Sequence, residues 1–302
     1  MVSSLKVHGA LILVGLIYGA NYSIAKSLMP DFIGAFGFIL LRVVGALLFF
    51  LIAHRIWIKE KITEKSDYLK LAVCAFFGVA TNMLCFFKGL SLTSPINASI
   101  IMTINPVIVL IFSAVLLKER VGWIKILGIA FGMTGAIMQI VDPLGVSKQV
   151  SGINWQGDLL VFANATSYAI YLVMVKPLMA KYHAFTVVKW TFTFGLLMVI
   201  PFGFSELASA NWASINAGIV ARLVFVVIGT TFLAYLLNAW ALRYVNSSVV
   251  GVYIYLQPLL ATIFAVAWAG YSFNWFMLIY AGLIFAGVYL VSFKPKSKLV
   301  NG

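Results

Sequence analysis

The stretch SPINASIIMTINPVIVLIFSAVLLKERVGWIKILGIAFGMTGAIMQIV, residues 94 to 141, decides the fold of this chain. A long apolar run is followed by the charged residues Lys118, Glu119 and Arg120, and then by a second apolar run. Each run is close to the ~20 apolar residues that cross the hydrocarbon core of a bilayer. The stretch therefore predicts a transmembrane hairpin.

The same hairpin pattern returns near the C-terminus, in residues 245 to 293. Three pairs of residues share one spacing of 152 positions: Pro106 and Pro258, Trp123 and Trp275, and Gly135 and Gly287. A further match joins residues 18 to 30 with residues 168 to 180 and sets Lys26 opposite Lys176. The chain therefore reads as two related halves. Chance similarity between apolar segments is the alternative interpretation.

The amino-acid composition is typical of a membrane protein. Of its 302 residues, 63% are hydrophobic and 10% are charged, and the mean hydropathy is +1.05. A water-soluble core does not need so much apolar sequence. The net charge of +13 lies between the apolar runs and not along one amphipathic face, so it indicates membrane topology and no nucleic-acid partner.

Apolar runs between charged or turn-rich breaks predict ten transmembrane helices. Their approximate ranges are 7–29, 32–54, 69–89, 95–117, 122–141, 158–177, 184–204, 218–240, 247–269 and 275–293. Because each half holds five spans, an odd number, the second half enters the membrane from the opposite side. The sequence thus predicts an all-α polytopic membrane protein with two inverted five-helix repeats, residues 1–145 and 146–302. Such repeats place a substrate site near the midplane between them.

The distribution of basic residues predicts the orientation. Of the 21 lysines and arginines, 16 fall on the face that carries both termini and 4 on the other face, with Arg42 alone in mid-span. Cytoplasmic loops carry the excess of Lys and Arg. Both termini are therefore expected in the cytoplasm, in a multi-pass protein of the cell membrane.

Several motifs together resemble the EamA-type members of the drug/metabolite transporter superfamily. They are GANYSIAK at 19–26, LLRVVGALL at 40–48, FFKGLSLTSPINAS at 86–99 and NPVIVLIFSAVLLKER at 105–120. The resemblance covers essentially the whole chain. It implies ten helices around a pseudo-twofold axis and a central cavity lined by spans 1, 3, 4, 6, 8 and 9. The nearest functional analogy is to aromatic amino acid exporters of that family.

The second half departs from the motifs at two places. Phe192 stands where Arg42 would repeat, and residues 270–272 read Gly-Tyr-Ser where Lys118, Glu119 and Arg120 would repeat. These first-half sites therefore have no counterparts in the second half.

The acidic residues all fall in or beside predicted loops. They are Asp31, Glu60, Glu64, Asp67, Glu119, Asp142, Asp158 and Glu206. A carboxylate inside a span is the usual proton relay and counter-ion for cationic cargo. The sequence therefore predicts transport without a membrane-embedded carboxylate.

Neutral polar and aromatic residues form stripes at helical spacing on several spans. The candidate substrate-binding residues are Tyr18, Asn21, Asn82, Phe86, Asn97, Asn105, Asn164, Tyr168, Tyr171, Tyr235, Asn238, Tyr253 and Gln257, with Tyr22 on the stripe of the first span. Amides and phenols on several spans can line one cavity for a small polar or zwitterionic solute. Hydrogen bonding between helices is the alternative role for each of them.

Arg42 and two prolines complete the candidate site. A guanidinium in mid-span must find acceptors, either in the protein or on an anionic part of the substrate. Pro106 and Pro258 each remove a backbone hydrogen bond from an apolar run. We expect them to act as hinges beside the cavity, with a packing kink as the alternative.

The sequence favours a secondary transporter that works by alternating access. Amino acids are the preferred substrate class, with export inferred from the family analogy alone. An anionic metabolite such as a sugar phosphate or nucleotide sugar is the alternative. A membrane enzyme or receptor is disfavoured because the chain has no His or acid pair at metal-ligand spacing, no Gly-rich phosphate loop and no sizeable soluble domain. No metal or cofactor is expected, and the chain is expected to be a monomer or homodimer.

Overall fold

The computed structural model describes residues 4–93, 98, 101–119, 121–141, 155–257, 259–260 and 275–292. In this part of the chain every regular element is a helix. The first half contains α1 (Ser4–Lys26), α2 (Ala35–Ala53), η1 (His54–Ile58), α3 (Lys65–Ala75), η2 (Phe76–Thr81), α4 (Asn82–Leu92), α6 (Asn105–Leu116) and α7 (Trp123–Val141). The second contains α8 (Trp155–Lys181), α9 (Ala184–Ala208), η4 (Trp212–Ser214), α10 (Ala217–Val224), η5 (Phe225–Leu233), α11 (Ala234–Ala241), α12 (Ser247–Val252), η6 (Tyr253–Tyr255) and α14 (Phe276–Ser292).

Helical residues occur in each of the ten predicted ranges. Among the described residues, six continuous helical runs are long and apolar enough to cross a membrane: Leu5–Lys26, Ala35–Ile58, Lys65–Leu92, Trp155–Lys181, Ala184–Ala208 and Ala217–Ala241. Asn105–Leu116, Trp123–Met138 and Leu278–Ser292 are shorter apolar helices. The all-helical class agrees with the prediction, whereas ten crossings and an inverted repeat stay predictions.

Several helix ends differ from the predicted ones by a few residues. α1 ends at Lys26, three residues before the predicted end, and the residues that follow it form turns. α8 and α9 run on to Lys181 and Ala208, since a helix continues past the apolar stretch into polar residues. Hydropathy marks the lipid-facing length, not the end of the hydrogen-bonded helix.

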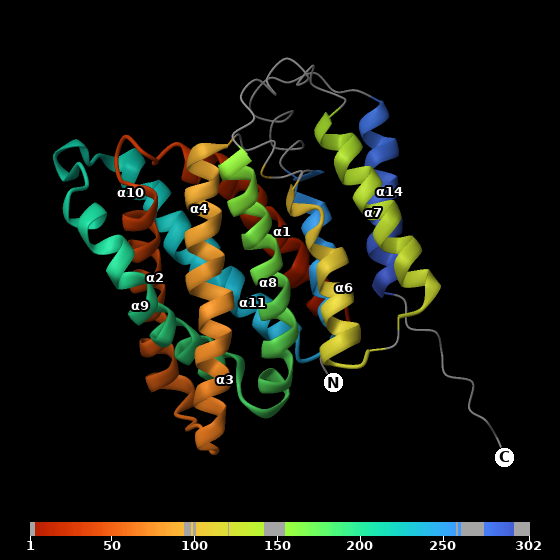
Figure 1. Cartoon of the computed structure of the whole chain (residues 1–302), viewed down its shortest axis with the longest axis horizontal. Coiled ribbons are helices and arrows are strands. Elements are labelled where there is room, and N and C mark those ends of the chain that lie inside the picture. Colours follow the sequence, from red (N-terminus) through yellow and green to blue (C-terminus); the bar gives the residue numbers. More distant parts are fainter. Residues whose placement is uncertain are drawn as a thin grey trace.

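The helices stand side by side in a bundle, and α7 and α14 form a pair at one edge of it (Figure 1). Glycine permits this close pairing: a Cβ on Gly287 would lie 2.6 Å from the carbonyl oxygen of Gly128 and from the backbone nitrogen of Gly132. α8 runs through the middle of the bundle and packs against α3, α4, α6 and α12. α8 therefore contacts helices of both halves of the chain.

The third helical run of each half contains a π-helical segment. The two runs begin at Lys65 and Ala217, which are 152 residues apart, and η2 and η5 interrupt them. Such segments leave carbonyls that side chains can use and often mark functional sites. Here the carbonyl of Phe77 accepts a hydrogen bond from Ser167 at 2.7 Å. The third helical run of each half is thus interrupted in the same way.

Two lysines tie helix ends together at opposite ends of the bundle. Lys26, the last residue of α1, donates to the carbonyls of Leu90, Ser91 and Thr93 at 2.6, 3.1 and 3.2 Å, at the end of α4. Lys176, near the end of α8, donates to Glu119 at 2.6 Å and to Asn246 at 3.0 Å. α8 is antiparallel to α4, so its end lies at the other face of the bundle.

The described acidic residues lie at helix ends and in connections. Glu206, near the end of α9, accepts from the backbone nitrogens of Phe36 and Gly37 at 2.7 and 3.0 Å and so caps the start of α2. Asp158, in the first turn of α8, accepts from Thr93 at 2.6 Å. Asp67 accepts from Lys181 at 2.6 Å. Each of these three carboxylates bonds a group on another helix or on the residue that follows it.

Candidate functional site

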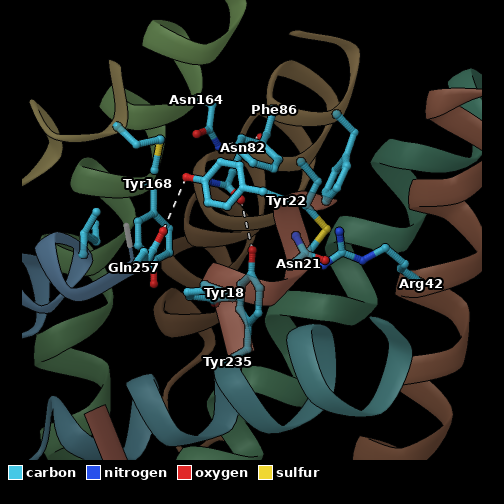
Figure 2. A pocket seen from close by; sticks show the side chains of 14 residues that line it. Tyr18, Asn21, Tyr22, Arg42, Asn82, Phe86, Asn164, Tyr168, Tyr235 and Gln257 are labelled. Carbon is cyan, nitrogen blue, oxygen red and sulfur yellow. Dashed lines mark hydrogen bonds between the residues drawn. The ribbon is translucent and has the colours of Figure 1, made fainter. Parts of the chain in front are cut away.

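A cavity lies between the two halves, at the centre of the bundle. Its lining residues are Tyr18, Asn21, Tyr22, Arg42, Asn82, Met83, Phe86, Phe87, Met102, Asn164, Tyr168, Tyr235, Ile254 and Gln257. They come from α1, α2 and α4 in the first half and from α8, α11 and η6 in the second, with Met102 and Gln257 just outside regular elements named above. Figure 2 shows these side chains around the space that they line. That space is about 540 Å³, open solvent at its mouth included.

Hydrogen bonds between amides and phenols fix one wall of the cavity. The Asn164 side chain donates to the carbonyl of Asn82 at 2.8 Å. The Tyr235 hydroxyl lies 3.0 Å from the Asn82 side-chain oxygen and 3.0 Å from the carbonyl of Gly78. Across the cavity, Tyr22 donates to Gln257 at 3.4 Å (Figure 2). The polar wall therefore joins α4 and α8 to α11, and α1 to the segment after η6.

Arg42 is the cation in the cavity lining. Its side chain is only 3% exposed, and its Nε and Nη2 donate to the hydroxyls of Thr231 and Thr230 at 2.9 and 3.1 Å. Its guanidinium lies 4.3 Å from the ring centre of Phe87, a cation–π distance. Nη1 has no hydrogen-bond partner in the described protein. Figure 2 shows the guanidinium directed toward Asn21 at the edge of the cavity.

Two acceptors in the same lining are also without partners. The side-chain oxygens of Asn21 and Asn164 are buried and accept no hydrogen bond from the described residues. None of the lining residues that the structure describes is acidic. Because buried polar groups are normally hydrogen-bonded, a polar ligand that bridges Arg42 and these amides would complete the site. The cavity can thus take one anionic and one hydrogen-donating group.

The structure brings together most of the predicted site residues. Those that line the cavity are Tyr18, Asn21, Arg42, Asn82, Phe86, Asn164, Tyr168, Tyr235 and Gln257. Asn97 and Pro258 lie outside the described residues. Tyr22 belongs to the predicted stripe of the first span and also lines the cavity. The stripes predicted on separate spans therefore face one space.

Four predicted residues lie behind the lining. Asn105 is fully buried and donates to the carbonyl of Ala165 at 2.6 Å, so it joins α6 to α8. Asn238 donates to the Tyr168 hydroxyl at 2.9 Å and holds that ring from behind. Tyr171 packs closely on Gly78, and Tyr253 bonds His8. These four were expected at the substrate; in this structure they contact other helices.

Pro106 lies at a break in the helical run. Thr103 and Ile104 form a turn, and α6 then begins at Asn105 with Pro106 in its first turn. A proline there loses no helical hydrogen bond. The expected helix break is therefore present, although the proline starts a helix instead of kinking one.

Four apolar lining residues were absent from the prediction. Met83, Phe87, Met102 and Ile254 face the cavity beside the polar groups. In an apolar span nothing in the sequence separates such residues from ordinary packing residues. Tyr22 and Phe86 extend this apolar side, with their rings 5.6 Å apart in an edge-to-face arrangement. The cavity therefore has one polar wall and one apolar, aromatic wall.

Comparison with known proteins shows a family match over nearly the whole chain. The model of the EamA-like transporter family matches twice, at residues 5–141 and 155–293. An "Uncharacterized transporter" of Archaeoglobus fulgidus is 29% identical over 76% of this chain and 78% of its own length. The "Uncharacterized transporter YyaM" of Bacillus subtilis is 24% identical over 95% and 94%.

The chain is also similar to a relative whose name includes a substrate class, and to a solved structure. A "Probable terminal-alkyne amino-acid exporter" of Streptantibioticus cattleyicolor is 28% identical over 75% of this chain and 73% of its own length. A solved crystal structure superposes with a TM-score of 0.75 over 96% of this chain and 98% of that chain, at 16% identity. At that identity the superposition shows the fold alone.

Proposed function

Since the chain belongs to the EamA-like transporter family, we propose that it moves a small zwitterionic metabolite of the amino-acid type through the central cavity. It is a transporter and not an enzyme, and it is a multi-pass membrane protein. The unpartnered Nη1 of Arg42 inside an acid-free cavity is the observation that carries the substrate proposal.

The charge of the lining matches a zwitterion. Arg42 supplies a charge-assisted hydrogen bond for a carboxylate. The free oxygens of Asn21 and Asn164 can accept from an ammonium group, and the rings of Tyr22 and Phe86 can face it. A purely cationic solute would find no carboxylate there, only the charge of Arg42, which repels it.

A phosphorylated substrate fits less well. A phosphate ester carries up to two charges and favours several convergent Lys or Arg residues. Arg42 is the one basic residue among the described residues of the lining. The apolar wall of Met83, Phe87, Met102 and Ile254 would instead receive a hydrocarbon side chain. An apolar amino acid such as leucine therefore uses both walls.

Alternating access is the proposed mechanism. Both halves contribute lining residues, and two matches of one family model separate the chain between residues 141 and 155. We infer an inverted pair of five-helix repeats that rock about the cavity, with both termini cytoplasmic in the cell membrane and Pro106 and Pro258 beside the moving parts. Export is proposed from the name of the Streptantibioticus relative.

The chain is proposed to work without a membrane-embedded carboxylate. Glu206 caps α2, Asp158 accepts from Thr93 at the end of α4, and Asp67 and Glu119 pair with lysines of α8. Proton uptake that accompanies the substrate in reconstituted vesicles, and that is lost on neutralising any one acid, would contradict this part of the proposal.

A thermal-shift experiment on purified protein in detergent tests the substrate class. We expect an apolar L-amino acid, with L-leucine as the first probe among the twenty, to raise the melting temperature because a ligand of the folded state stabilises it. L-Leucinol, which lacks the carboxylate, and 4-methylpentanoate, which lacks the ammonium group, should each raise it less. Glucose 6-phosphate should have no effect.

Two variants locate the effect. Arg42→Gln should abolish the shift by leucine, whereas Arg222→Gln, a change at an exposed arginine outside the cavity lining, should keep it. A shift by glucose 6-phosphate, with none by any amino acid, would replace the zwitterion with the anionic alternative.

A further inference from the structure

The side edge of the Arg42 guanidinium is occupied by two consecutive threonines from the other half of the chain. Nε donates to Thr231 at 2.9 Å and Nη2 donates to Thr230 at 3.1 Å. Both threonines are fully buried. Arg42 lies on α2 and both threonines on η5, so the contact crosses the interface between the halves.

The hydroxyl protons of the threonines fix the direction of these bonds. Thr230 and Thr231 donate to the same carbonyl, that of Val226, at 2.7 and 2.8 Å. A hydroxyl has a single proton, so each threonine keeps only lone pairs for Arg42. The pair is thus a dedicated acceptor for a cation that donates through two nitrogens.

The π-helical segment makes this arrangement possible. Thr230 and Thr231 follow Val226 by four and five residues, and both reach its carbonyl within η5. In a regular α-helix a threonine hydroxyl reaches a carbonyl three or four residues back, not five, and consecutive side chains diverge by ~100°. η5 therefore presents two hydroxyls together to one guanidinium.

We propose that Thr230 and Thr231 are positioning residues that leave Nη1 of Arg42 as the donor for the substrate carboxylate. This inference rests on the proposed function. With Nε and Nη2 held, the guanidinium cannot rotate to offer its side edge to a substrate. The carboxylate then receives its hydrogen bond at the end of the guanidinium, and the ammonium group of the same substrate can donate to the free oxygen of Asn21.

Isosteric variants test the role of the hydroxyls. Thr230→Val and Thr231→Val should each weaken L-leucine binding about tenfold, measured by calorimetry, because a hydrogen bond to a charged group is lost. Binding of L-leucinol should change by less than about twofold, since it has no carboxylate to misplace. Thr230→Ser and Thr231→Ser should restore leucine binding.

Thr191→Val is the matched control. Thr191 is also fully buried, and its hydroxyl donates to the carbonyl of Val187 at 2.9 Å within α9. The variant makes the same chemical change at a buried threonine that does not hydrogen-bond Arg42, and leucine binding should stay unchanged. Equal losses for leucine and leucinol in the Thr231 variant, or no loss at all, would overturn the inference.

A measurement without ligand separates this inference from the proposed function. In protein labelled with ¹⁵N-arginine, the Nε–H signal of Arg42 should move in Thr231→Val, return in Thr231→Ser and stay in place in Thr191→Val. If the wild type binds no amino acid, the proposed function fails while this spectrum still reports the positioning. If the signal does not respond to Thr231, the positioning fails on its own.

Discussion

Lys26 and Lys176 stand 150 residues apart at matching places in the two halves, and each ties a helix end to its neighbours with a different kind of partner. Lys26 donates to backbone carbonyls at the end of α4. Lys176 donates to the carboxylate of Glu119 and to the amide oxygen of Asn246. The first contact uses the negative end of a helix; the second uses two side chains.

The contact at one end of the bundle therefore depends on one side chain, that of Lys26. The contact at the other end depends on three, those of Lys176, Glu119 and Asn246. No side-chain change can remove the carbonyls that Lys26 uses. Glu119 is 12% exposed in its side chain, and one of its oxygens has no partner in the described protein. Removing Lys176 therefore leaves a half-buried carboxylate uncompensated. The two ends should respond differently to equivalent mutations.

Lys176→Met should have the largest effect of the three changes that test this contrast. We expect a loss of ~2 kcal/mol in the free energy of unfolding, between the values for buried and exposed ion pairs, because both side chains are only partly exposed. The melting temperature in detergent measures it. Lys65→Met, at an exposed lysine, is the control and should leave the melting temperature unchanged.

A second substitution tests whether the unpaired carboxylate of Glu119 causes the loss of stability. Glu119→Gln in the Lys176→Met background removes the stranded charge and should recover part of the loss. If the double variant is no more stable than Lys176→Met alone, the uncompensated carboxylate is not the cause.

Lys26→Met should have a smaller effect, ~1 kcal/mol, because water at the helix end can replace the ammonium at the carbonyls of Leu90, Ser91 and Thr93. Lys26→Arg should retain most of the stability. A drop in melting temperature as large as that of Lys176→Met would show that the two ends are equivalent after all.

Asn246→Ala should have the smallest effect, ~0.5 kcal/mol, since it removes one hydrogen bond and leaves the ion pair of Lys176 intact. The melting temperature should fall by less than in either lysine variant. A loss equal to that of Lys176→Met would assign the contact to the amide and not to the carboxylate.

Much of this architecture was open to prediction from the sequence. Apolar length predicted where helices lie, because burial in lipid leaves the backbone no other partner. Arg42 was expected to need acceptors, and Thr230 and Thr231 supply them. The stripe with Asn164 and Tyr168 was expected to face other helices with similar stripes, and both residues line the cavity.

Other features depend on packing that no periodicity reports. Asn105 carries the same amide as Asn21, yet it bonds a carbonyl of α8 while Asn21 faces the cavity. Met83 and Ile254 look like any apolar residue of a span. A π-helical segment has no characteristic amino-acid composition. The sequence therefore could not show that Thr230 and Thr231 are the acceptors of Arg42. Sequence periodicity predicts which residues share one face of a helix. The partners of that face are known only from the packed structure.

The π-helical segments also bear on how such a chain can change over time. A π turn holds one residue more than the α-helix it interrupts, and each residue of an α-helix corresponds to ~100° of rotation. Deleting one residue from η5 would therefore swing Tyr235 and Asn238 away from their present neighbours while the start of α10 stayed in place. The extra residue thus sets the rotation of the helix that follows it. Insertions and deletions there re-aim one end of a membrane helix without disturbing the lipid contacts of the other.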